Sequence, residues 1–97
     1  MNAQDKYESA KEMLQMDAYD VRKWQRNRGF NDRTDLMNAL DNAEAGYRNK
    51  NVQQIKDALE VWKDQKEDLH PTEKEIIGGF FRQAEYTLDR VEKAKNL

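Results

Sequence analysis

Few residues of this chain carry the side chains that catalysis or metal binding usually needs. The 97 residues include one His, one Ser and no Cys. A zinc site needs three or four His, Cys or carboxylate ligands held together, so His70 cannot anchor an ordinary one. Ser9 lies near the N-terminus, far in sequence from the only His that could activate it, so we expect no hydrolase triad. His70 directly precedes Pro71 and is expected to be a turn residue.

Other recurrent site patterns are incomplete as well. Gly78-Gly79 is not preceded by a strand pattern and is not followed by the Lys-Ser/Thr of a phosphate-binding loop. A di-iron carboxylate bundle needs two Glu-x-x-His pairs, which a single His cannot supply. A phosphotransfer His should project from the middle of a helix, whereas His70 lies at an expected helix boundary. We therefore expect no enzyme activity, no bound metal and no cofactor.

The composition predicts one helical domain over residues 1–97. Lys and Arg number 17 against 19 Asp and Glu, which leaves a net charge of -2. A single Pro, four Gly and many residues of high helix propensity favour helix over strand. No apolar segment is long enough for a membrane span or a signal-peptide core. We expect a soluble, cytoplasmic protein without a membrane partner.

Apolar residues recur at steps of three and four in four segments, and each segment is expected to form a helix. The first runs from about residue 2 to 28, and the second ends near residue 49. The third extends from residue 51 to Pro71, and the fourth follows it. Short connections make consecutive helices antiparallel, so the predicted fold is all-α, a small up-down bundle of about four helices. Two longer outer helices flank two shorter middle ones, and a break of the first helix near Asp17 stays open.

Helix starts are expected at residues whose side chains can accept backbone hydrogen bonds. Asp32 or Thr34 could cap the second helix, and Asn51 the third. Thr72-x-x-Glu75 matches the capping box, in which two side chains satisfy each other's backbone donors, and would begin the fourth helix.

Two adjacent glycines, Gly78 and Gly79, lie inside the fourth helical segment. Each costs roughly 1 kcal/mol relative to Ala in a helix interior. We therefore expect a close approach of another helix, or a local bend, to compensate.

The only basic concentration of the chain lies at the end of the first helix. Between residues 21 and 33 five cations face one acid, a local charge of +4, with Trp24 and Phe30 interleaved. Residues 57–75 carry seven acids against three lysines, a local charge of -4, and an up-down bundle places both segments at the same end. The five cations, called the basic patch below, are Arg22, Lys23, Arg26, Arg28 and Arg33.

Three interpretations of the basic patch stay open. The cations could complement the dipole at the helix C-terminus and pair with acids of the third helix. They could neutralise phosphates of a nucleic acid while Trp24 stacks on a base. They could also contact an acidic protein. A net charge of -2 weakens the nucleic-acid interpretation, because phosphate binders usually have an excess of basic residues over the whole domain.

The fourth helix has an apolar face wider than a single neighbouring helix covers, so either it lies centrally and touches two neighbours, or part of the face is exposed for self-association or a partner. Its apolar residues include two doublets, and adjacent helical residues point about 100° apart. Arg and Tyr follow beside this face at four-residue steps, a composition favoured at interface hot spots. We therefore predict a partner-binding surface made of Ile76, Phe80, Phe81, Arg82, Tyr86 and Arg90.

Together these patterns predict a small non-enzymatic helical protein that binds another protein stoichiometrically, as an adaptor, inhibitor, immunity-type protein or assembly factor. A homodimer through the fourth helix is compatible with the same surface. The alternative is a nucleic-acid-binding accessory protein that uses segment 21–33.

Overall fold

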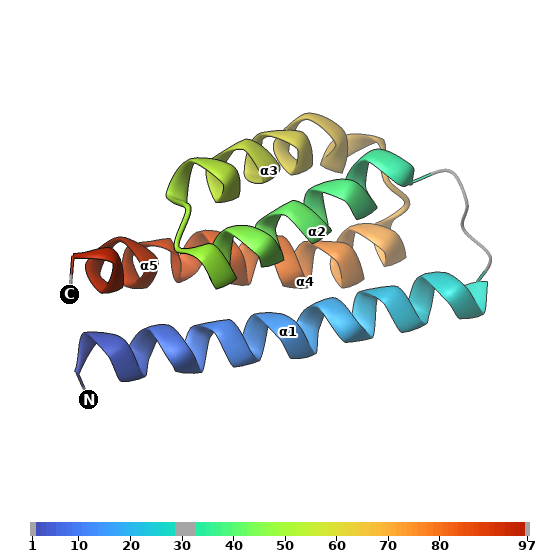
Figure 1. Cartoon of the computed structure of the whole chain (residues 1–97). Coiled ribbons are helices and arrows are strands. Elements are labelled where there is room, and N and C mark those ends of the chain that lie inside the picture. The colour runs from blue at the N-terminus through green and yellow to red at the C-terminus, as the bar shows by residue number, and fades with distance from the viewer. Residues whose placement is uncertain (1, 29–32, 97) are drawn as a thin grey trace.

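The computed structural model describes residues 2–28 and 33–96, and within these ranges the regular structure is helical, without strands. The all-α prediction is therefore confirmed (Figure 1). None of the helices in the described ranges is both long and apolar enough to cross a membrane. The elements are α1 (Ala3–Arg28), α2 (Thr34–Asn49), α3 (Val52–Gln65), the short 3-10 helix η1 (Lys66–Asp68), α4 (Pro71–Tyr86) and α5 (Leu88–Lys95).

The helices form an elongated up-down bundle with extents of 41 × 22 × 19 Å. α5 continues the direction of α4, so that α4 and α5 together make the fourth helix of the bundle (Figure 1). The predicted lengths are confirmed, because α1 has 26 residues while α2 and α3 have 16 and 14. The start of α1 and the end of α5 reach past the α2–α3 turn, and α1 and α5 pack against each other (Figure 1).

α1 is continuous, which settles the question of a break near Asp17. The side-chain oxygen of Asn2 accepts a hydrogen bond from the backbone N–H of Asp5 at 2.8 Å and caps the start of α1. The predicted cap at Asn51 is confirmed, since its side chain accepts from the Gln54 N–H at 3.1 Å. α2 begins at Thr34 without a side-chain cap. Asp32, the other candidate, lies outside the described residues.

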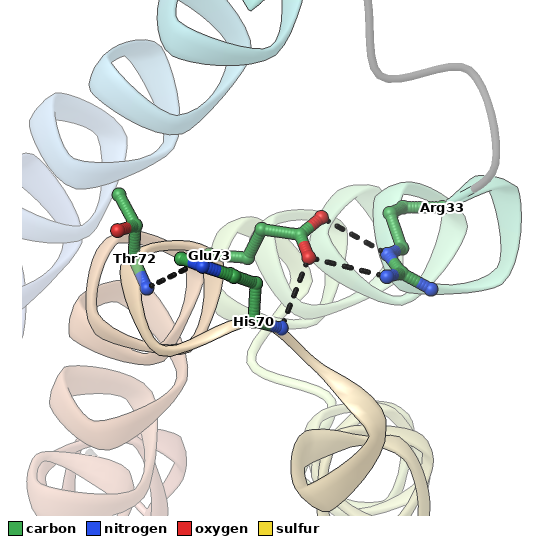
Figure 2. Close-up of polar contacts among 4 residues, drawn as sticks. All are labelled: Arg33, His70, Thr72 and Glu73. Atoms are coloured by element: carbon green, nitrogen blue, oxygen red, sulfur yellow. Dashed lines mark hydrogen bonds and ion pairs between the residues drawn. The ribbon is translucent and has the colours of Figure 1, made fainter.

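The capping box of α4 lies two residues earlier than predicted. Figure 2 shows that His70, not Thr72, occupies the cap position. Its Nδ1 accepts from the Thr72 N–H at 3.2 Å, and the Glu73 carboxylate accepts from the His70 N–H at 3.1 Å. The assignment to Thr72 and Glu75 is wrong because Pro71, which has no N–H and a helical φ, is suited to the first helical position. α3 correspondingly ends at Gln65, well before Pro71.

Tyr47 of α2 joins three parts of the bundle. Its hydroxyl contacts the Thr87 hydroxyl and donates to the Ala84 carbonyl at 2.8 Å, at the junction of α4 and α5. Its own carbonyl accepts a hydrogen bond from the Tyr7 hydroxyl of α1. Burial raises the pKa of Tyr47 to about 12, so the ring remains neutral and able to donate at physiological pH.

The two glycines of α4 face different surroundings. A Cβ at Gly78 would lie 3.0 Å from the ring of Trp62 in α3, so this glycine allows the two helices to approach closely. The Trp62 ring has little room to move, because it is stacked on Phe81 with a centroid distance of 5.3 Å. A Cβ at Gly79 would meet no atom within 4 Å. Close approach therefore explains Gly78 but not Gly79.

We expect Gly79→Ala to stabilise the protein by about 0.5–1 kcal/mol, because the new methyl group enters open space and the helix loses a flexible residue. Gly78→Ala is the matched comparison and should destabilise it, because its methyl group presses on Trp62. Urea unfolding followed by circular dichroism measures both changes. A loss of stability in Gly79→Ala would contradict this account of α4.

Candidate functional site

The predicted partner-binding surface on the fourth helix divides into a buried and an exposed part. Phe80 and Phe81 are completely buried, so the prediction that they contribute to an exposed surface is wrong. The reason is the central position of α4, which packs against α1 on one side and α3 on the other and has both sides of its apolar face covered. Ile76 is half-buried and packs against the core.

Arg82 and Tyr86 are exposed, and Arg90 is half-buried. Tyr86 has 78% of its side chain exposed, the largest fraction among the large hydrophobic residues that the structure describes. One guanidinium N–H of Arg82 donates to the Glu75 carbonyl at 3.4 Å, and one of Arg90 donates to the Lys6 carbonyl at 3.4 Å. The first contact lies within α4, and the second joins α5 to α1. The role of the three residues in partner binding stays a prediction.

Tyr86 lies between two hollows whose rims are mostly basic. The hollow between α3 and α4, of about 400 Å³, is lined by Lys63, Lys66 and Arg82 with Glu85 as its only acid. The hollow between α1 and α5, of about 660 Å³, is lined by Lys6, Arg90 and Lys93 with Asp89 as its only acid. We call these cations together with Tyr86 the Tyr86 surface. It has six cations against two acids in a chain whose net charge is -2.

The two acids compensate only a small part of this charge. Lys63 lies 3.8 Å from the Glu85 carboxylate, and Lys93 lies 3.7 Å from that of Asp89. Both pairs are exposed to solvent, where such contacts contribute little. Sequence reasoning missed the lysines because they come from α1, α3, η1 and α5, and Lys63 and Lys66 fall within the segment that counts as acidic. The positive potential of the Tyr86 surface is a product of the fold.

The described members of the basic patch have different surroundings. Arg22 pairs with Asp41 and Glu44 of α2. The predicted pairing with acids of the third helix is therefore wrong for Arg22, because α2 rather than α3 packs beside the end of α1. Lys23 and Arg26 are exposed.

Arg28 and Arg33 are the remaining members of the basic patch. The side chain of Arg28 lies outside the part that the structure describes. Arg33 precedes α2 and reaches Glu73 of α4, with two N–H groups donating to the two carboxylate oxygens at 3.1 Å each (Figure 2). The expected proximity of basic and acidic segments at one end of the bundle is confirmed by this pair. Trp24, interleaved in the patch, packs against the core, and Phe30 lies outside the described residues.

The pair of Arg33 and Glu73 is a structural clamp. The Glu73 side chain is only 4% exposed, and its carboxylate serves both the guanidinium and the backbone N–H of His70. Hydrogen bonds from Arg33 are the largest cause that holds the pKa of Glu73 below its usual value of 4.5, against the opposing effect of burial. The carboxylate thus ties the start of α4 to the start of α2.

We expect Glu73→Gln to lower the free energy of unfolding by about 1.5–3 kcal/mol at neutral pH, the range for hydrogen bonds to charged groups. Glu75→Gln provides the control, because Glu75 is exposed on the same helix. Urea unfolding compares the two. Equal effects of the two substitutions would contradict the clamp.

The contribution of Glu73 should also depend on pH. Because its pKa is lowered in the folded state, the stabilisation is complete above the unfolded value near 4.5 and is lost as the pH falls through the folded pKa. The stability difference between wild type and Glu73→Gln should therefore shrink in acid. Urea unfolding at a series of pH values measures it, and a difference that grows below pH 4 would overturn this assignment.

Family models, curated proteins and solved structures were compared with the chain, and none of them matches it. The functional interpretation therefore depends on the chemistry of the Tyr86 surface and of the basic patch.

Proposed function

We propose that this chain is a non-enzymatic cytoplasmic protein that binds another protein stoichiometrically through the Tyr86 surface. The observation that supports the proposal most directly is the 78% exposure of Tyr86, placed between Arg82 and Arg90. Tyr and Arg are enriched among residues that dominate binding energy. A Tyr ring also has few rotatable bonds, so it loses little conformational entropy when a partner covers it. Adaptor, inhibitor, immunity-type and assembly proteins all act in this way.

The charge of the Tyr86 surface indicates the chemistry of the partner. Six cations against two acids favour a partner with an acidic contact surface. Such complementarity accelerates association and disfavours basic partners more than it raises affinity. The hollow beside Trp62 offers room for an apolar side chain of the partner at the centre of the contact.

Nucleic-acid binding through segment 21–33 is the alternative. It has less support, because carboxylates of α2 and α4 already pair with Arg22 and Arg33. Lys23 and Arg26 are exposed and remain available to phosphates. Binding of this kind would weaken steeply with salt.

The proposal is tested by capture of partners from host lysate, with and without nuclease, read by mass spectrometry. We expect one nuclease-resistant protein with wild type, and at least about a thirtyfold loss of affinity for it in Tyr86→Ala, as for a hot-spot residue. Arg82→Glu should have a similar effect, because it reverses a charge on the rim of the hollow.

Tyr19→Ala is the matched control, since Tyr19 is also an exposed Tyr, 58% accessible, but lies on α1 away from the basic hollows. Circular dichroism should show unchanged helicity in all variants. Equal capture by the Tyr86 and Tyr19 variants would refute the Tyr86 surface. Recovery that disappears with nuclease, and with Lys23→Glu plus Arg26→Glu, would favour the nucleic-acid alternative.

A further inference from the structure

A second uncovered surface lies on α1. Lys6, Ser9, Met13, Asp17 and Asp20 follow one another at steps of three and four, so they share one face of this helix, which we call the α1 face. Met13 is 46% exposed, and Lys6 and Asp20 are exposed as well. In Figure 1, α2, α4 and α5 lie on one side of α1. The α1 face borders that side, because Lys6, Ser9 and Met13 line the hollow between α1 and α5, and Ser9 and Asp17 are half-buried.

Charge divides the α1 face into two halves. Around Lys6 the rim is basic, because Arg90 and Lys93 of α5 line the same hollow. The other half carries Asp17 and Asp20, for which no ion pair is found among residues 2–28 and 33–96. Burial, and then the charge of Asp20, raise the pKa of Asp17, as expected for neighbouring carboxylates without a nearby cation.

An apolar centre separates the two halves. Met13 lies between them on α1, and Tyr86 of α4 lines the same hollow as Met13. Both side chains are large, and Met13 is 46% and Tyr86 78% exposed. The surface therefore has the order basic, apolar, acidic along the helix. An exposed apolar centre of this kind is typical of a contact surface.

The spacing of the charges is symmetric about Met13. Lys6 and Asp20 lie seven residues before and after it, and Ser9 and Asp17 lie four residues before and after it. A surface with this symmetry is complementary to a copy of itself turned by a two-fold axis. Charge complementarity thus identifies the occupant of the α1 face as a second copy of this chain.

We propose that the protein forms a two-fold symmetric dimer in which the α1 helices of two copies pack antiparallel, with Met13 at the axis. Lys6 of each copy then faces Asp20 of the other, and Ser9 faces Asp17 of the other. The parallel orientation places Lys6 against Lys6 and Asp20 against Asp20, and is disfavoured by like-charge repulsion. Tyr86 of each copy extends the apolar centre on the α4 side.

The dimer goes beyond the proposed binding of another protein and is measured on the purified chain alone. Sedimentation equilibrium over a range of concentrations should show a monomer–dimer equilibrium for the wild type. Lys6→Glu and Asp20→Lys should each weaken the dimer about tenfold or more, since each places like charges in contact at two symmetric positions. Met13→Asp should do the same by placing two carboxylates at the axis.

The double variant with Lys6→Glu and Asp20→Lys is the decisive measurement. It exchanges the two charges, and the antiparallel arrangement predicts that dimerisation returns to near the wild-type level. Lys56→Glu and Asp57→Lys reverse exposed charges on α3 and should leave the equilibrium unchanged. Circular dichroism confirms that each variant is folded.

A wild type that remains monomeric at every concentration would overturn the proposal. A dimer that is insensitive to the single charge reversals, or that the double variant fails to restore, would overturn it too. Lys6 and Tyr86 belong to both surfaces, whereas Arg82 belongs only to the Tyr86 surface and Asp20 only to the α1 face. Arg82→Glu should therefore affect capture alone and Asp20→Lys dimerisation alone, which distinguishes the two proposals.

Discussion

The buried hydroxyl of Tyr47 must find hydrogen-bond partners inside the bundle, and its position determines how the helices are placed. It finds them in Ala84 and Thr87, which fixes the α2–α3 hairpin against the junction of α4 and α5. The Tyr7 hydroxyl, bonded to the Tyr47 carbonyl, brings α1 into the same arrangement. Thr87 points inward to this cluster, while the preceding residue, Tyr86, is exposed to solvent.

Internal ion pairs decide which cations remain available for a partner. Arg22 and Arg33 hold carboxylates of α2 and α4, and the Arg33 pair also secures the cap of α4 through Glu73. Removal of either arginine would leave a poorly solvated carboxylate, Glu44 or Glu73, so these arginines are committed to structure. The cations around Tyr86 have weaker and more exposed contacts, which makes them the better candidates for recognition.

Both proposed contact surfaces involve the pair of long helices, α1 and α4–α5, and the α2–α3 hairpin contributes Lys63 to the Tyr86 surface. Gly78 allows Trp62 of this hairpin to lie close to α4, and Trp62 in turn stacks on Phe81. Phe80 and Phe81, which were predicted to bind a partner, are buried by this packing. What remains for partners is a rim of long charged side chains with Tyr86 and Met13 between them.

The sequence by itself determined the helical class, the four segments, their relative lengths and the cap at Asn51, because apolar periodicity and capping are local properties. It misplaced the start of α4, since Pro71 and Thr72 offer competing local signals that only the hydrogen bonds of Glu73 resolve. It also could not separate Phe81 from Tyr86, because exposure depends on which neighbours pack on each side of α4. Tertiary structure alone decided the Tyr86 surface. Its cations belong to α1, α3, α4, α5 and the segment after α3. Charges so distant in sequence form one basic surface only when packing brings them together.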